Sequence, residues 1–192
     1  MNLKGSQTEK NLLLAYLGES NNRNLYTYFA YKAREEGYEQ IAAVFFETAE
    51  HEHEHARQEL NLIGTSDVEL PAGTYPVKGV GSTVSNLENA VSGEHYEQTE
   101  MYPDFAGKAE EEGFTEIARL FRDIAVAEAY HEQRFRTLLN NIKEGKVFEK
   151  DGVVIWKCRA CGYLHNGKEA PQRCPVCAYG RAYFETLAED YS

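Results

Sequence analysis

The chain has 192 residues, of which 42% are hydrophobic and 27% are charged, and its formal net charge is −11. This composition is typical of a globular protein and excludes a disordered chain. No apolar run approaches the roughly 18 residues that a transmembrane helix needs. The N-terminal segment is too polar for a signal peptide, so we expect a cytoplasmic protein. The whole negative charge falls in residues 1–150, because residues 151–192 contain five basic and five acidic residues. Such a segment repels a phosphate backbone, which argues against a nucleic-acid partner.

The spacing of apolar residues predicts four long helices, over residues 7–37, 39–63, 86–112 and 114–144. Pro103 predicts a bend in the third of them. The connection over residues 64–85 contains many glycine and proline residues and is not expected to be helical. Two helical hairpins joined by one long crossover form a four-helix bundle. We therefore expect an all-α domain over residues 1–148.

The two halves of the predicted bundle repeat each other. The segment KAREEGYEQIAAVF at 32–45 matches KAEEEGFTEIARLF at 108–121, at an offset of 76 residues. The same offset relates Tyr26 to Tyr102. It also relates the Glu52 and His55 pair to Glu128 and His131.

Each Glu-x-x-His pair places a carboxylate and an imidazole one turn apart, on the apolar face of its helix. Glutamates also occupy the apolar faces of the first and third predicted helices. Five ionised carboxylates buried without partners would cost several kcal/mol each, and two divalent cations would nearly cancel their charge. Oxygen and imidazole donors suit iron or manganese. The sequence therefore predicts a two-metal site with the ligands Glu19, Glu52, His55, Glu94, Glu97, Glu128 and His131.

A solvated helix face would explain the run EHEHEH at 50–55 equally well, and Glu50 with His53 offers a competing pair. The repeat favours Glu52 and His55, because that pair aligns with the second Glu-x-x-His. We interpret the other histidines as surface residues or as partners of the ligands; they are His51, His53, His95 and His165. Tyr26 and Tyr102 are either core aromatics or hydrogen-bond donors to ligand carboxylates.

The four cysteines of the chain form two C-x-x-C pairs, Cys158 with Cys161 and Cys174 with Cys177. This spacing predicts a tetrathiolate metal site and leaves zinc and iron both open. Short strands are expected around it, over residues 153–157 and 183–187. Residues 149–192 are therefore predicted to form a second, small domain.

Six motifs resemble the rubrerythrin family: GES at 18–20, EHEH at 52–55, GEHYEQTEMYPDFA at 93–106, AEAYH at 127–131, WKCRACGY at 156–163 and CPVC at 174–177. The resemblance covers residues 5–190 and implies a ferritin-like di-iron bundle followed by a rubredoxin-like domain. It implies two non-haem iron ions on the glutamate and histidine set and a third iron on the four cysteines. It also implies that His55 is a ligand in one oxidation state and gives way to Glu97 in the other. We expect four residues to take part in catalysis: Glu97, His55, Tyr26 and Tyr102.

The activity implied by the resemblance is the reduction of hydrogen peroxide to water, in protection against oxidative stress. Electrons would come from an NAD(P)H-dependent reductase or a rubredoxin. A head-to-tail homodimer would place the small domain of one chain against the bundle of the other. Two alternatives remain open: a ferroxidase or iron-handling protein of ferritin type, and a zinc-ribbon module that binds a partner. The tetrathiolate domain argues against the first, and the acidic bundle argues against a nucleic-acid partner for the second.

Overall fold

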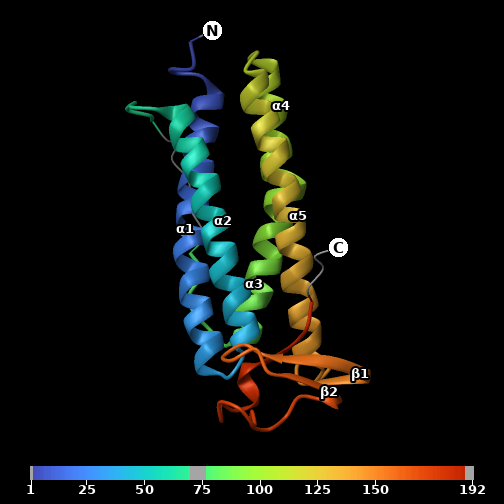
Figure 1. The fold of residues 1–192 in the computed structure, drawn as a ribbon. Helices are drawn as coiled ribbons and strands as arrows, with labels where there is room; N and C mark the ends of the chain where they lie inside the picture. Colours follow the sequence, from blue (N-terminus) through green and yellow to red (C-terminus); the bar gives the residue numbers. More distant parts are fainter. Residues whose placement is uncertain (1, 70–76, 189–192) are drawn as a thin grey trace.

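The computed structural model describes residues 2–69 and 77–188. The molecule consists of a bundle of long helices with a small β-sheet at one end (Figure 1). The helical elements are α1 (Gln7–Glu35), α2 (Glu39–Ile63), α3 (Thr83–Tyr96), the π-helix η1 (Glu97–Met101), α4 (Tyr102–Glu111) and α5 (Thr115–Lys143). The remaining elements are β1 (Glu149–Cys158), β2 (Leu164–Glu169), the short 3-10 helix η2 (Arg181–Tyr183) and β3 (Phe184–Thr186). In the described residues, no helix combines the length and apolarity needed to cross a bilayer.

The two hairpins turn at equivalent places. Gly37 and Gly113 lie 76 residues apart and adopt positive φ angles of 86° and 82°, a backbone conformation that glycine reaches without steric cost. Each glycine lies two residues after the end of a helix, so the first and third predicted helices end slightly earlier than expected, at Glu35 and Glu111. The last predicted helix ends at Lys143, one residue earlier than expected.

The third predicted helix is present in the structure, but its predicted start is wrong. It begins at Thr83 rather than at residue 86, because the side chain of Ser82 accepts a hydrogen bond from the backbone N–H of Ser85. The helix is also interrupted by a π-helical turn, η1, which ends two residues before Pro103, near the predicted bend. Proline lacks the N–H that an α-helix requires and its ring crowds the carbonyl four residues earlier, so the wider turn accommodates it. Part of the predicted connection, residues 70–76, lies outside the described residues.

The core of the bundle is divided into two apolar clusters. Phe29, Phe45 and Phe135 belong to the cluster nearer the β-sheet, and Leu12 and Phe121 belong to the other. Along every long helix, the residues between the two clusters include buried glutamates. The bundle therefore has a polar layer in the middle of its core.

The small sheet has the strand order β2-β1-β3, with both pairs antiparallel. Its core is formed around Trp156, which is fully buried and donates its indole N–H to the carbonyl of Gly167. The sequence predicted β1 and β3 but missed β2, because LHNGKE is largely polar and exposed. Where the two parts meet, the ring of Tyr38 stacks on Phe148, with 6.2 Å between ring centroids.

Because the helices and the sheet have separate apolar clusters, we expect a chain ending at Phe148 to fold. It keeps the whole helical core and the stacking of Phe148 on Tyr38. Circular dichroism should show the helical content of the bundle and a cooperative thermal transition. A truncated chain that melts without cooperativity would show that the small sheet is required for the bundle to fold.

Candidate metal centres

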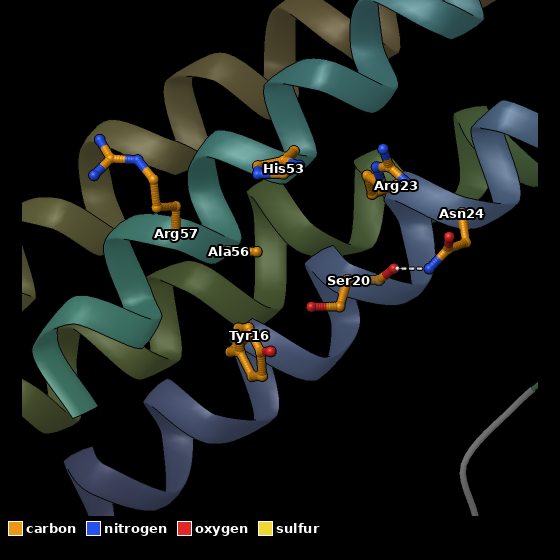
Figure 2. Close-up of a pocket in the computed structure, with 7 residues that line it drawn as sticks. All are labelled: Tyr16, Ser20, Arg23, Asn24, His53, Ala56 and Arg57. Atoms are coloured by element: carbon orange, nitrogen blue, oxygen red, sulfur yellow. Dashed lines mark hydrogen bonds between the residues drawn. The ribbon is translucent and has the colours of Figure 1, made fainter. Parts of the chain in front are cut away.

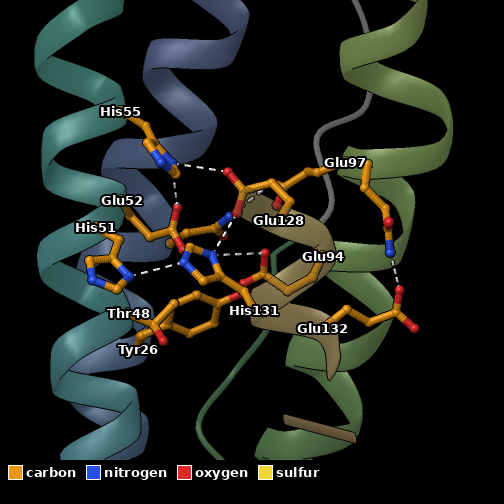
Figure 3. A network of polar contacts seen from close by, with 12 residues as sticks. Tyr26, Thr48, His51, Glu52, His55, Glu94, Glu97, Glu128, His131 and Glu132 are labelled. Carbon is orange, nitrogen blue, oxygen red and sulfur yellow. Dashed lines mark hydrogen bonds and ion pairs between the residues drawn. The ribbon is translucent and has the colours of Figure 1, made fainter. Parts of the chain in front are cut away.

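The polar layer brings together carboxylates and imidazoles from all the long helices (Figure 3). Their oxygen and nitrogen atoms form two groups, in each of which the atoms lie within 4.8 Å of one another. The first group is Glu19, Glu52, His55 and Glu128, and the second is Glu52, Glu94, Glu128 and His131. Glu52 and Glu128 belong to both groups. Two adjacent cation sites that share two carboxylates would need this arrangement.

Both histidines present Nδ1 to the carboxylates. The Nδ1 atom of His55 lies 2.9 Å from Glu128 and 3.7 Å from Glu19. The Nδ1 atom of His131 lies 2.6 Å from Glu128 and 3.6 Å from Glu94. Each Nδ1 atom also lies 3.3 Å from Glu52. Each imidazole therefore faces one carboxylate of its own group and both carboxylates that the two groups share.

The donor atoms fit a pair of metal ions, because they are buried without other partners. In the part of the chain that the structure describes, each predicted glutamate ligand has at least one buried carboxylate oxygen without a well-directed hydrogen bond. The same is true of the Nδ1 atom of each predicted histidine ligand. The residues are Glu19, Glu52, His55, Glu94, Glu97, Glu128 and His131. Leaving such groups unsatisfied is costly in a protein interior. Bound cations would satisfy them.

Burial and neighbouring carboxylates hold the pKa of Glu52 and of Glu97 well above the usual range. Burial raises the pKa of Glu94 to about 8. Burial also acts on Glu128, but its close contacts with the imidazoles of His131 and His55 outweigh burial and lower the pKa of Glu128 to about 2. The cluster without metal thus retains protons on several carboxylates, and metal binding must displace them.

A second centre is formed by the four cysteines of the small sheet. The Sγ atoms of Cys158 and Cys177 are 3.7 Å apart, and those of Cys161 and Cys174 are 3.6 Å apart. A disulfide requires about 2.05 Å, whereas a tetrahedral metal with bonds of about 2.3 Å to sulfur separates its sulfurs by about 3.8 Å. All four sulfurs lie within 4.8 Å of one another, so they fit one tetrahedral ion.

The comparisons with known proteins agree with both centres. The family model "Rubrerythrin" matches residues 10–139, and the model "Rubrerythrin, rubredoxin-like domain" matches residues 156–185. The chain belongs to the rubrerythrin family. It is 50% identical to a rubrerythrin from Porphyromonas gingivalis, over 98% of this chain and 94% of that protein. It is 49% identical to a rubrerythrin from Nitratidesulfovibrio vulgaris, over 96% of each. A solved structure of nigerythrin in a mixed-valence state matches with a TM-score of 0.65 and 35% identity, over 97% of this chain and 88% of that chain.

The rubrerythrin fold also decides between the two competing Glu-x-x-His pairs. Glu50 is exposed, and His53 lies on the outer surface of α2. His53 lines a groove of about 350 Å³ between α1 and α2, together with Tyr16, Ser20, Arg23, Asn24, Ala56 and Arg57 (Figure 2). None of the residues that line this groove is a predicted ligand. The competing pair is therefore a solvated face.

Glu97 lies outside both groups of donor atoms. It begins η1 and is buried. One of its carboxylate oxygens accepts a hydrogen bond of 2.9 Å from the side-chain amide of Asn22, and its other oxygen has no partner among the described residues. The structure thus places His55, and not Glu97, in the group of donor atoms that contains Glu19.

The two repeat-related tyrosines donate hydrogen bonds to carboxylates, as one of the two interpretations from the sequence predicts. The hydroxyl of Tyr26 donates to Glu94, and that of Tyr102 donates to Glu19. Burial and nearby carboxylates hold the pKa of both phenols well above the usual range. Both tyrosines therefore stay protonated at neutral pH and fix the orientation of the carboxylates.

Sequence reasoning missed Glu59 as a site residue, although it lies on the apolar face of α2, one turn after His55. Glu59 is fully buried, and its Oε1 lies 3.1 Å from the hydroxyl of Tyr102. The repeat gave no signal, because the equivalent position is Phe135. Burial and the charge of Glu19 hold the pKa of Glu59 well above the usual range.

We expect Glu59→Gln to stabilise the metal-free protein by a margin that grows with pH. A raised pKa in the folded state means that stability is lost as pH rises from about 4.5 towards that pKa, and glutamine removes this loss. Between pH 5.5 and 8, the difference in the free energy of unfolding should increase by up to about 1.4 kcal/mol per pH unit. Urea unfolding measures it, and the exposed Glu100→Gln is the control. A difference that is constant over this range would contradict the assignment.

Proposed function

We propose that this protein is a non-haem di-iron peroxidase that reduces hydrogen peroxide to water. One observation carries the proposal: a carboxylate and histidine pair of sites and a tetrathiolate site lie in one chain. Iron held by four thiolates is a one-electron carrier, and the two-site cluster has the donor set of di-iron carboxylate proteins. A ferroxidase or iron-storage protein would not need the second centre.

In this proposal, one iron is held by Glu19 and His55 and the other by Glu94 and His131, with Glu52 and Glu128 shared by both. The third iron is held by the four cysteines. The mixed oxygen and imidazole donors suit iron, and a similar solved structure, of nigerythrin, is of a fully reduced, all-ferrous state. Thiolate ligands require cysteines kept out of disulfides, which fits a cytoplasmic protein.

The reaction consumes hydrogen peroxide, two electrons and two protons and yields two water molecules. The bound iron pair would supply the two electrons and polarise the peroxide oxygens as a Lewis acid. Glu97 is a carboxylate outside the two donor groups: Asn22 donates a hydrogen bond to one of its oxygens, and the other oxygen has no hydrogen-bond partner among the described residues. In this proposal, Glu97 would turn towards the position that His55 occupies. A carboxylate would then replace a neutral imidazole as a ligand, which adds negative charge when oxidation makes the iron pair more positive.

Tyr26 and Tyr102 hold Glu94 and Glu19 in place from opposite ends of the polar layer. Because both phenols keep their protons, they remain hydrogen-bond donors throughout the cycle. Their proposed role is to keep Glu94 and Glu19 oriented while Glu97 replaces His55 as a ligand.

The small domain would receive electrons from an NAD(P)H-dependent reductase or a rubredoxin. Cys161 is exposed, and Val176 beside Cys177 is also exposed, so this edge of the tetrathiolate site is open to a partner. We propose a head-to-tail homodimer, in which the exposed edge of one chain faces the bundle of the other.

A stopped-flow experiment tests the proposed activity. The fully reduced protein is mixed with hydrogen peroxide or with dioxygen at equal concentrations, and the return of the oxidised absorption is followed. We expect peroxide to oxidise the protein much faster, with one peroxide consumed for every two electrons. Faster oxidation by dioxygen would favour the ferroxidase alternative and overturn the proposal.

We further expect electrons to cross between subunits. Lys143, the last residue of α5, lies twelve residues after His131, or about 18 Å along the helix axis. The small sheet lies beyond that end of the bundle (Figure 1), so transfer within one chain spans a long distance. A heterodimer tests this, with Glu128→Ala in one chain and Cys158→Ser plus Cys174→Ser in the other.

The heterodimer contains one intact bundle and one intact tetrathiolate site, on different chains. Peroxidase activity with a reductase should be well above that of either mutant homodimer. Metal analysis of each chain is the control. An inactive heterodimer with the correct metal content would mean that electrons travel within a chain.

A further inference from the structure

A histidine outside the predicted ligand set touches one of the ligands. The Nδ1 atom of His51, on α2, lies 3.0 Å from the Nε2 atom of His131, on α5 (Figure 3). The two rings are nearly parallel, with 5.2 Å between their centroids and 12° between their planes. His131 is buried, whereas His51 is partly exposed at the edge of the bundle.

The geometry decides which nitrogen of His131 carries a proton when metal is bound. Its Nδ1 faces Glu128, Glu52 and Glu94, so this nitrogen would bind the metal and carry no proton. The proton of the neutral ring then lies on Nε2 and needs an acceptor. The Nδ1 atom of His51 is at hydrogen-bond distance and accepts it when His51 carries its own proton on Nε2.

The other predicted histidine ligand has no such partner. In the described part of the chain, the polar contacts of His55 all involve Nδ1. The repeat offset of 76 residues relates His51 to Ala127, whose side chain cannot accept a hydrogen bond. The two halves of the bundle therefore have matching ligands, but they differ in whether the Nε2 atom of the histidine ligand has a hydrogen-bond partner.

We propose that His51 is a positioning residue that accepts the Nε2–H of His131 and fixes its Nδ1 towards the metal. This inference rests on the metal ligands of the proposed function. A ligand whose second nitrogen is held has its ring orientation set before metal binds, and loss of such a partner weakens metal affinity. His131 is thereby the fixed imidazole of the pair, and His55 is the one free to leave.

Cobalt binding to the full-length protein tests the proposal, after one equivalent of Zn²⁺ has filled the four cysteines. We expect His51→Leu to lower the Co²⁺ affinity of one of the two bundle sites by about 10- to 100-fold. His51→Gln should restore most of the affinity, because its amide oxygen is an acceptor. His53→Leu is the matched control, since His53 is exposed on the same helix and lines the outer groove.

A measurement on the unmutated protein complements these variants. In the Co²⁺ form, the imidazole N–H resonances of the two ligands are shifted by the metal, and that of His131 should exchange with solvent more slowly than that of His55. Wild-type affinity in His51→Leu, equal loss in His51→Gln or His53→Leu, or equal exchange of the two N–H protons would each overturn the proposal. If the wild-type bundle binds no Co²⁺, the proposed function fails as well; if it binds two ions and His51→Leu does so equally, only this inference fails.

Discussion

The central constraint on this structure is that a layer of buried carboxylates requires positive charge to compensate it. Glu19, Glu52, Glu94 and Glu128 are almost fully buried between two apolar clusters, in a region where water does not compensate their charge. An apolar core without this layer would be more stable, because each buried ion carries a desolvation cost. The arrangement makes physical sense as a binding site in which cations offset the cost.

Side chains around the layer donate hydrogen bonds to some of the carboxylate oxygens. Tyr26 and Tyr102 satisfy one oxygen of Glu94 and of Glu19, and Asn22 satisfies one oxygen of Glu97. The other oxygen of each of these three carboxylates is buried without a hydrogen-bond partner among the described residues. The π-helical turn η1 contains Glu97 and widens the helix at this point, which is a feature often found at functional sites. The helix geometry and the polar layer are thus parts of one arrangement.

The internal repeat makes the bundle nearly symmetric, and the departures from symmetry lie at the metal site. Glu52 and His55 correspond to Glu128 and His131, but Glu59 corresponds to Phe135 and His51 to Ala127. The α2 half therefore carries an additional carboxylate and an additional imidazole. A symmetric site would treat both metal positions alike, whereas these residues give the positions different surroundings.

The sequence by itself determined the fold class and the four-cysteine centre, because helical periodicity, an internal repeat and C-x-x-C spacing are local signals. It also predicted the six residues that the structure brings together in the two donor groups, whereas the predicted ligand Glu97 lies outside both. It did not determine the start of α3, the π-helical turn or strand β2, since these depend on a capping hydrogen bond, on how the helix accommodates the ring of Pro103 and on pairing with β1. Only the tertiary structure showed that Glu59 is buried beside Tyr102 and that His51 reaches His131. Contacts between α2 and its neighbouring helices depend on how the helices are rotated and packed, and no spacing within a single helix encodes that.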